Sequence, residues 1–252
     1  MIAGESLATP SPALARLRVF FTPALLVVGL GISYVVFQSL SGNIADDQVL
    51  NQSFLASRLF EHVEISLISF VIVTAIGVPV GIVVSGAGRV VRLPVFLLAN
   101  LGQAVPSIGI LVLLYAFLGL GVSPTIIALV AYGTLPVLRN TVAGMQGVDP
   151  AAIEAARGMG MTRMQALWRV QVPLASPLIF AGLRTALVLI IGTGTLGNFI
   201  GGGGLGDVIA SGIDISDRIV FVGAVMVATL ALLADWLLSL VERTVVPQRT
   251  TG

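Results

Sequence analysis

Two charged residues lie far inside long apolar stretches of the sequence. Arg184 follows Pro173 by eleven residues and Asp235 precedes Arg243 by eight, which at ~1.5 Å per helical residue puts them roughly 16 and 12 Å from the nearest polar flank. Charges at such depth are costly in lipid and usually face a bundle interior or a cavity. The two side chains either pair with each other or pair separately, Arg184 then with backbone carbonyls or with a second copy of the chain. Both residues are therefore candidates for a polar passage.

Two polar residues and a proline interrupt another apolar stretch at a similar depth. They are Gln103, Pro106 and Ser107. A proline frees one backbone carbonyl and favours a kink, and polar groups beside a kink are suitable walls for a passage. Structural packing explains these three residues almost as well, so both interpretations stay open.

The only histidine of the chain is flanked by acids. Glu61, His62 and Glu64 are residue types that bind metals, but one helical turn cannot direct all three inward, so interfacial solvation or pairing is the favoured interpretation. No motif places a nucleophile beside His62, which argues against a Ser-His-Asp arrangement. The absence of cysteine excludes thiolate metal sites and disulfides.

Glycines form patterns that resemble nucleotide-binding loops only superficially. Gly192, Gly194 and Gly197 spell G-x-G-x-x-G, but the motif needs a strand before it and a helix after it. Inside an apolar stretch, small residues instead let helices approach closely. The same reasoning favours a helix crossing at Gly77, Pro79 and Gly81. The run 201–204 is expected to shape a flexible gate or a docking surface in an external loop.

The composition indicates that membrane-spanning helices position these residues. Of the 252 residues 56% are hydrophobic and 10% charged, and the mean hydropathy is +1.04, which excludes a water-soluble globule. The 13 basic residues nearly balance the 12 acidic ones, so nothing indicates nucleic acid binding. Crossing ~30 Å of hydrocarbon takes about 20 apolar residues. Six stretches qualify, at 19–40, 65–85, 95–120, 124–143, 174–200 and 219–241.

We therefore predict an all-α, polytopic membrane protein with about six transmembrane helices. The first stretch is longer than the ~7–15 apolar residues of a signal peptide, which favours a retained span. The fourth is the weakest candidate, because only 124–138 is free of charge before Arg139; a re-entrant segment is the alternative.

Orientation follows from the arginines, the only basic residues in the chain. Loops rich in arginine stay on the cytoplasmic side. With the N-terminus inside, Arg58 and Arg218 lie outside and Arg184 in the bilayer, whereas ten lie inside: Arg16, Arg18, Arg89, Arg92, Arg139, Arg157, Arg163, Arg169, Arg243 and Arg249. Both termini are predicted to be cytoplasmic. The expected organisation is a leader at 1–17, a transmembrane domain at 18–245 and a tail at 246–252.

The cytoplasmic segment 145–173 is too patterned for a linker. Asp149 can cap a first short helix, with Pro150 at its first position and alanines after it. Gly158 and Gly160 are expected to end this helix. A small, nearly flat surface of this kind suits insertion into a groove of another protein. The alternative is a solvated loop, because short alanine-rich helices are marginal in water.

A second short helix is predicted directly after the first. Thr162 and Gln165 have the spacing of a capping box, in which each side chain satisfies a backbone donor of the other. Pro173 is expected to close this helix at the membrane surface.

The same segment carries a family resemblance. Residues 154–160 read EAARGMG, followed after nine residues by Val170, Gln171, Val172 and Pro173. The pattern closely resembles the EAA signature of permease subunits of bacterial ABC importers, with valine at both aliphatic positions. The resemblance implies a type I ABC importer permease architecture in the bacterial plasma membrane.

Further motifs narrow the resemblance. Residues 103–107 read QAVPS, 182–196 read GLRTALVLIIGTGTL and 201–207 read GGGGLGD. Together they look like the permeases of osmoprotectant importers for glycine betaine, carnitine, choline or proline betaine. The substrate class rests on this likeness only.

The resemblance also implies partners and roles. Glu154, Ala155, Ala156 and Gly160 would contact a cytoplasmic ATPase, which binds ATP and magnesium and carries out the hydrolysis. This chain, which has no lysine and therefore no Walker A motif, would be a translocation subunit without enzyme activity. It would work with an extracytoplasmic binding protein and a second permease, identical or a sister chain.

Two other functions remain as alternatives. One is a secondary, ion-coupled transporter, which would bind its coupling ions within the bundle. The other is an ABC permease for a different small solute, such as an amino acid.

Overall fold

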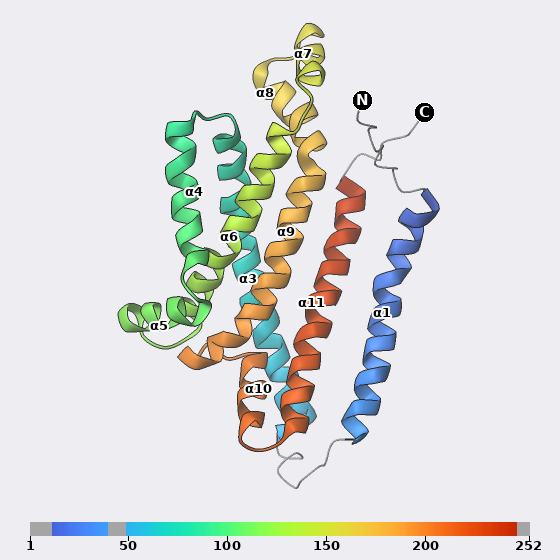
Figure 1. Cartoon of the computed structure of the whole chain (residues 1–252), viewed down its shortest axis with the longest axis vertical. Coiled ribbons are helices and arrows are strands. Elements are labelled where there is room, and N and C mark those ends of the chain that lie inside the picture. Colours follow the sequence, from blue (N-terminus) through green and yellow to red (C-terminus); the bar gives the residue numbers. More distant parts are fainter. Residues whose placement is uncertain (1–11, 40–48, 246–252) are drawn as a thin grey trace, which may run out of the picture.

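The computed structural model describes residues 12–39 and 49–245, and this part of the chain is helical with no β-strand. Figure 1 shows long, roughly parallel and antiparallel helices, with α7 and α8 at one end of the bundle and α10 at the other. We call these the inner end and the outer end. Residues 1–11 of the predicted leader and the whole predicted tail, 246–252, lie outside the described residues.

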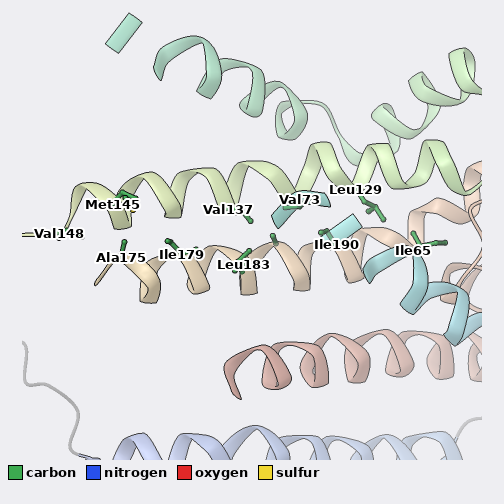
Figure 2. Close-up of a cluster of buried hydrophobic side chains, with 11 residues drawn as sticks. Ile65, Val73, Leu129, Val137, Met145, Val148, Ala175, Ile179, Leu183 and Ile190 are labelled. Carbon is green, nitrogen blue, oxygen red and sulfur yellow. The ribbon is translucent and has the colours of Figure 1, made fainter. Parts of the chain in front are cut away.

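Three long helices form the core: α3 (Gln52–Ser85), α6 (Val122–Gln146) and α9 (Val172–Gly194). Their buried apolar side chains meet along most of the bundle, as Figure 2 shows. The cluster consists of Ile65, Val73, Leu129, Val137, Met145, Val148, Ala175, Ile179, Leu183, Ala186 and Ile190. Because their side chains interdigitate, these three helices are the rigid frame on which the remaining elements are placed.

Glycines bring the core helices close together. A methyl group added at Gly77 would lie 2.9 Å from Cγ1 of Val137, and one at Gly81 would lie 2.6 Å from Cβ of Thr141. Both distances are shorter than van der Waals contact, so only glycine fits where α3 crosses α6. The predicted helix crossing at Gly77 and Gly81 is therefore confirmed, while Pro79 lies inside the continuous helix α3.

The kink predicted at Pro106 within the stretch 95–120 is confirmed, and it is a full break in the helix. The stretch divides into α4 (Arg89–Ala104) and α5 (Ser107–Leu118), which are bent by 96° at the break. Pro106 lies in this break, and its ring prevents Val105 from continuing the helix. Figure 1 shows α5 turning away from the bundle.

The stretch at 124–143 is a full helix, although it was the weakest candidate in the sequence. α6 runs for 25 residues through Arg139. Nη2 of Arg139 donates a hydrogen bond to Oδ1 of Asn100 on α4 at 2.6 Å. The charge is therefore accommodated by a neighbouring helix, and the re-entrant alternative does not hold.

The prediction that Pro173 closes a helix is wrong. The short helix α8 (Arg163–Ala166) continues through a π-helical turn, η1 (Leu167–Gln171), directly into α9. Pro173 lies in the first turn of α9. A wider π turn immediately before the proline changes the backbone register, so the missing N–H does not break the rod.

The chain ends α9 in a 3₁₀ turn, η2 (Thr195–Ile200), and then forms α10 (Leu205–Ile213) and α11 (Asp217–Val245). α1 (Pro12–Ser39) lies along α11 at the edge of the bundle (Figure 1). In the described part of the chain, four helices are long and apolar enough to cross a membrane, or five if α4 and α5 count as one span. The apolar part of α1, Pro23–Ser39, is shorter.

Candidate functional sites at the two ends and within the bundle

The inner-end helices are stabilised by their own sequence. Oδ1 of Asp149 accepts a hydrogen bond from the N–H of Ala151 at 2.9 Å, and Pro150 opens α7 (Pro150–Gly158). Thr162 and Gln165 form both bonds of the capping box before α8, at 3.3 and 2.9 Å. The predicted caps are confirmed.

Three of the four residues predicted to contact a partner are on the surface. Glu154, Ala155 and Gly160 are exposed, and Gly160 has a φ of +87°, a conformation that strains other residues. Ala156 is different, because it is only 1% exposed. Its side chain lies on the inward face of α7, so it seats the helix and offers no contact surface in this structure.

Sequence reasoning missed an apolar surface beside these residues. Met159, Met164 and Trp168 are 73%, 63% and 56% exposed. Nε1 of Trp168 donates to Sδ of Met164 at 3.1 Å, which joins α8 to the π turn. Large apolar side chains in an otherwise polar segment were the available signal. Exposed large apolar side chains of this kind, two of them in contact with each other, are typical of a surface that binds another protein.

Packed side chains and one hydrogen bond attach the inner-end helices to the core, in addition to the continuous helix from α8 through η1 into α9. Ile153, Leu167 and Val172 pack against the core cluster. Nε2 of Gln171 donates to the carbonyl of Met145 at 3.2 Å. A push on α7 would thus reach α6 and α9 through packed side chains.

Arg184 and Asp235 pair with each other. Nε and Nη2 of Arg184 donate to Oδ1 and Oδ2 of Asp235 at 2.7 and 2.8 Å. The two parallel bonds form a bidentate pair that joins α9 to α11. A second carboxylate, Oε2 of Glu242, lies 3.7 Å from Nη1 of Arg184. The hypothesis of direct pairing is confirmed, and the alternative of separate partners does not hold.

The pair faces an open groove of about 620 Å³ on the surface of α9 and α11. The groove is lined by Ala181, Arg184, Thr185, Val188, Leu189 and Asp235. It therefore combines two opposite charges with an apolar wall.

The third group of predicted path residues lies elsewhere. Nε2 of Gln103 donates to the carbonyl of Tyr132 on α6 at 2.9 Å, and Pro106 and Ser107 lie at the bend between α4 and α5. Figure 1 shows α4 and α5 on one side of α6 and α11 on the other. The structure does not bring these residues together with Arg184 and Asp235.

At the outer end, His62 is buried, contrary to the solvation that the sequence left open. It is 1% exposed. Nε2 lies 2.9 Å from the carbonyl oxygen of Ile191, and Nδ1 accepts from the N–H of Leu205 at 3.3 Å. The two bonds fix a neutral imidazole with its proton on Nε2. Pairing, the other favoured interpretation, is confirmed, and both ring nitrogens are occupied.

Two neighbours of His62 also bind the start of α10. Oε2 of Glu61 accepts from the N–H of Gly204 at 3.1 Å. Nη1 of Arg58 contacts Oε2 of Glu61 at 2.6 Å and Oδ2 of Asp207 at 2.9 Å. Glu61 and His62 on α3 therefore satisfy the first backbone donors of α10, whose own N-cap residue, Gly204, has no side chain for this.

The glycine run packs tightly, where the sequence predicted a flexible gate or a docking surface. Gly201, Gly203 and Gly204 have positive φ angles of 71°, 75° and 80°. Gly202 and Gly204 are buried. A methyl group at Gly204 would lie 2.9 Å from Nδ1 of His62. Glycine is therefore required for this turn to reach α3.

The G-x-G-x-x-G pattern is explained by packing at two of its three positions. A methyl group at Gly194 would lie 3.2 Å from Cε1 of His62, and one at Gly197 would lie 2.6 Å from Cγ2 of Thr125. Gly192 has nothing within 4 Å. Close approach of neighbouring elements accounts for the first two positions.

Comparison with known proteins identifies the family. Residues 77–247 match the family described as "Binding-protein-dependent transport system inner membrane component". The chain belongs to this family. The match includes the inner-end helices, the Arg184–Asp235 pair and the glycine turn, so all the candidate sites except the α3 residues 58–62 lie inside it.

Curated relatives extend the similarity. The choline transport system permease protein OpuBB of Bacillus subtilis (strain 168) is 39% identical over 202 residues, which cover 78% of this chain and 91% of the relative. OpuCB of the same strain, a glycine betaine/carnitine/choline transport system permease protein, is 41% identical over 80% of this chain and 93% of its own length. The carnitine transport permease protein OpuCD of Listeria monocytogenes serotype 1/2a (strain 10403S) is 37% identical over 78% and 89%.

Solved structures show the same fold. An inward-facing structure of the MetNI methionine ABC transporter matches with a TM-score of 0.67 at 22% identity, over 77% of this chain and 96% of that one. An amino acid ABC transporter crystallised with histidines matches with a TM-score of 0.66 at 21% identity, over 81% and 100%. The all-α permease architecture expected from the sequence is thereby confirmed for this inner-membrane component.

Proposed function

We propose that the chain is the permease subunit of an ATP-binding-cassette importer for a quaternary ammonium osmoprotectant, such as glycine betaine, choline or carnitine. The relatives named above, at 37–41% identity, are permeases for these solutes. The chain supplies the translocation path. A separate ATPase binds ATP and magnesium, and an extracytoplasmic binding protein delivers the solute.

The observation that carries this proposal is the exposed inner-end surface. Glu154 and Ala155 are exposed on α7, and Gly160 is exposed in the turn after it. Met159 and Trp168 add exposed apolar side chains to this surface. Side chains of both kinds together suit a protein groove, in which the apolar residues bury area and Glu154 makes a charge-assisted hydrogen bond. This surface is where the ATPase docks, and residues 145–173 are the coupling segment of a transmembrane domain spanning 18–245.

The arginines support a cytoplasmic location for the inner end. Arg89 and Arg92 begin α4, and Arg243 lies in the last turn of α11. In Figure 1 both of these helix ends point toward the same end of the bundle as α7 and α8. Arg58 and Arg218 lie in the opposite ends of α3 and α11. With the inner end in the cytoplasm, the positive-inside rule is satisfied, and both termini are cytoplasmic.

A second permease completes the transporter, since two ATPase subunits need two coupling segments. The partner is an identical copy or a sister chain. Gln103, Pro106 and Ser107 line the path at the bend between α4 and α5, and Arg184 and Asp235 line it between α9 and α11.

Reversing the charge of Glu154 tests the docking surface. In cells that express the whole transport system, Glu154→Lys is expected to reduce copurification of the ATPase at least tenfold, because a lysine would repel the positive partner that binds Glu154. The matched control is Asp214→Lys, an exposed acid at the opposite end, which should leave copurification unchanged. Normal copurification and ATP-driven uptake in Glu154→Lys would contradict the docking assignment.

The class of transporter is tested by removing the ATPase. The purified chain alone in liposomes is expected to move no solute under an ion gradient. Uptake under these conditions would show a secondary transporter and overturn the proposed function.

A further inference from the structure

The Arg184–Asp235 pair leaves one donor group unused. A guanidinium carries five N–H donors. Nε and Nη2 of Arg184 bond to Asp235, whereas Nη1 lies 3.7 Å from Glu242, beyond hydrogen-bond range. Within residues 12–39 and 49–245, Nη1 therefore has a nearby charge but no hydrogen-bond acceptor.

The unused donor belongs to a side chain that is not sealed inside the protein. The side chains of Arg184 and Asp235 are 37% and 21% exposed, and both line the groove of about 620 Å³. Ala181, Val188 and Leu189 supply the apolar part of its wall. A small molecule in the groove would thus meet a guanidinium, a carboxylate and aliphatic side chains together.

The charges of the ion cluster formed by Arg184, Asp235 and Glu242 do not cancel. Asp235 and Glu242 carry two negative charges against the single positive charge of Arg184, which leaves one in excess. A cationic group of a ligand would be attracted to this excess negative charge. The groove therefore favours a ligand with a positive centre.

The residues that line the groove indicate which kind of cationic group it can bind. A quaternary ammonium group has no N–H donor and is covered with methyl groups, so it requires negative charge and apolar contact and no hydrogen-bond acceptor. The Asp235 carboxylate beside Val188 and Leu189 provides both. A carboxylate on the same ligand would accept hydrogen bonds from Nη1 of Arg184.

We propose that this groove is a solute-binding station in the translocation path. It holds a zwitterionic solute with its carboxylate on Nη1 of Arg184 and its quaternary ammonium group beside Asp235. The proposal rests on the proposed function for its solute class. Because the solute carboxylate and Glu242 compete for Nη1, Glu242 sets the preference between solutes: it weakens binding of zwitterions and strengthens binding of cations that lack a carboxylate.

The substitution Glu242→Gln separates these two effects. Equilibrium binding of radiolabelled glycine betaine and choline is measured on the permease–ATPase complex in nanodiscs, without the binding protein, so that only sites in the membrane complex are counted. We expect the Kd of glycine betaine to fall and that of choline to rise, each by about threefold, the scale of one partly exposed charge. A shift in opposite directions cannot come from general destabilisation.

Two further variants complete the experiment. Glu64→Gln, which removes an exposed carboxylate of α3, should change neither Kd. Arg184→Gln should abolish measurable glycine betaine binding, and monodisperse elution with bound ATPase shows that the variant is folded.

Three outcomes would overturn the proposed solute-binding station. If both Kd values stay unchanged in Glu242→Gln, or move in the same direction, or if wild type binds neither solute, the groove is not the station. ATP-driven uptake by the intact importer is measured in parallel. Import of a quaternary ammonium solute in that assay would leave the proposed function standing, whereas absence of such import would reject its substrate class.

Discussion

The two ends of the bundle each present a nine-residue helix, and these helices are stabilised in opposite ways. α7 at the inner end starts with a cap from Asp149, its own neighbour in sequence. α10 at the outer end takes its first hydrogen bonds from Glu61 and His62, both 143 residues away from the donors they bind. α7 displays exposed residues, whereas α10 begins with the buried residues Gly204 and Leu205.

The difference shows how one chain divides stability between two tasks. A helix that must present its surface to a partner can be capped locally. A helix whose start fills the end of the bundle has no water to satisfy its backbone, so its donors must find protein partners. The inner end is therefore the adaptable end, and the outer end is the one fixed by tertiary contacts.

The largest expected difference in stability between the two ends comes from adding one methyl group at each of them. In Gly206→Ala the new carbon would overlap the carbonyl oxygen of Thr195, so η2 and α10 must separate, and we expect a loss of about 3 kcal/mol or more. In Gly158→Ala the new carbon meets nothing within 4 Å, and stability should stay equal or rise by up to about 1 kcal/mol. Thermal unfolding in detergent measures both. Equal shifts in the two variants would contradict the contrast between the ends.

A smaller effect is expected from removing one cap at each end. His62→Ala leaves the buried Leu205 N–H without the acceptor that it has in the wild type, at a cost of about 1–3 kcal/mol. Asp149→Ala removes an exposed cap and should cost about 1 kcal/mol, confined to α7. Amide hydrogen exchange distinguishes them: His62→Ala should increase exchange in both α3 and α10, and Asp149→Ala in α7 only. Exchange confined to α10 in His62→Ala would show that the cap does not couple the two helices.

The smallest effect concerns the ion pair between Arg58 and Asp207. Their side chains are 28% and 24% exposed, so solvent screens the interaction and we expect a coupling of about 0.5–1 kcal/mol. A double-mutant cycle with Arg58→Gln and Asp207→Asn measures it from unfolding midpoints. Arg58→Gln combined with Glu154→Gln at the other end is the control and should be additive. A coupling free energy as large as the loss of stability in His62→Ala would show that the ion pair, and not the buried imidazole, is the main stabilising contact at the outer end.

Local patterns made the inner end predictable from sequence. Asp149–Pro150 and Thr162-x-x-Gln165 form their bonds within three residues, so the chemistry of the segment alone decides them. The local pattern also predicted a helix end at Pro173. The helix instead continues, because a π turn in the preceding residues accommodates the proline. At Pro106 the helix did break, between Ala104 and Ser107.

The outer end and the groove could be predicted only in part. The depth of Arg184 and Asp235 in their spans indicated that both charges need partners. Only the structure shows that the two helices are close enough for Nε of Arg184 to reach Oδ1 of Asp235, at 2.7 Å. The glycine run 201–204 resembled an open loop because its partners, Glu61 and His62, lie far away in sequence.

The sequence by itself determined that the chain crosses a membrane as helices, where the inner-end caps form and which charges cannot remain alone in lipid, since hydropathy, capping and desolvation depend on residue type and short spacing. Tertiary structure alone decided which side chains meet across helices: His62 with Leu205, Arg184 with Asp235, and Ala156 turned inward. These contacts depend on the crossing of α3, α6 and α9, which close packing around their glycines sets.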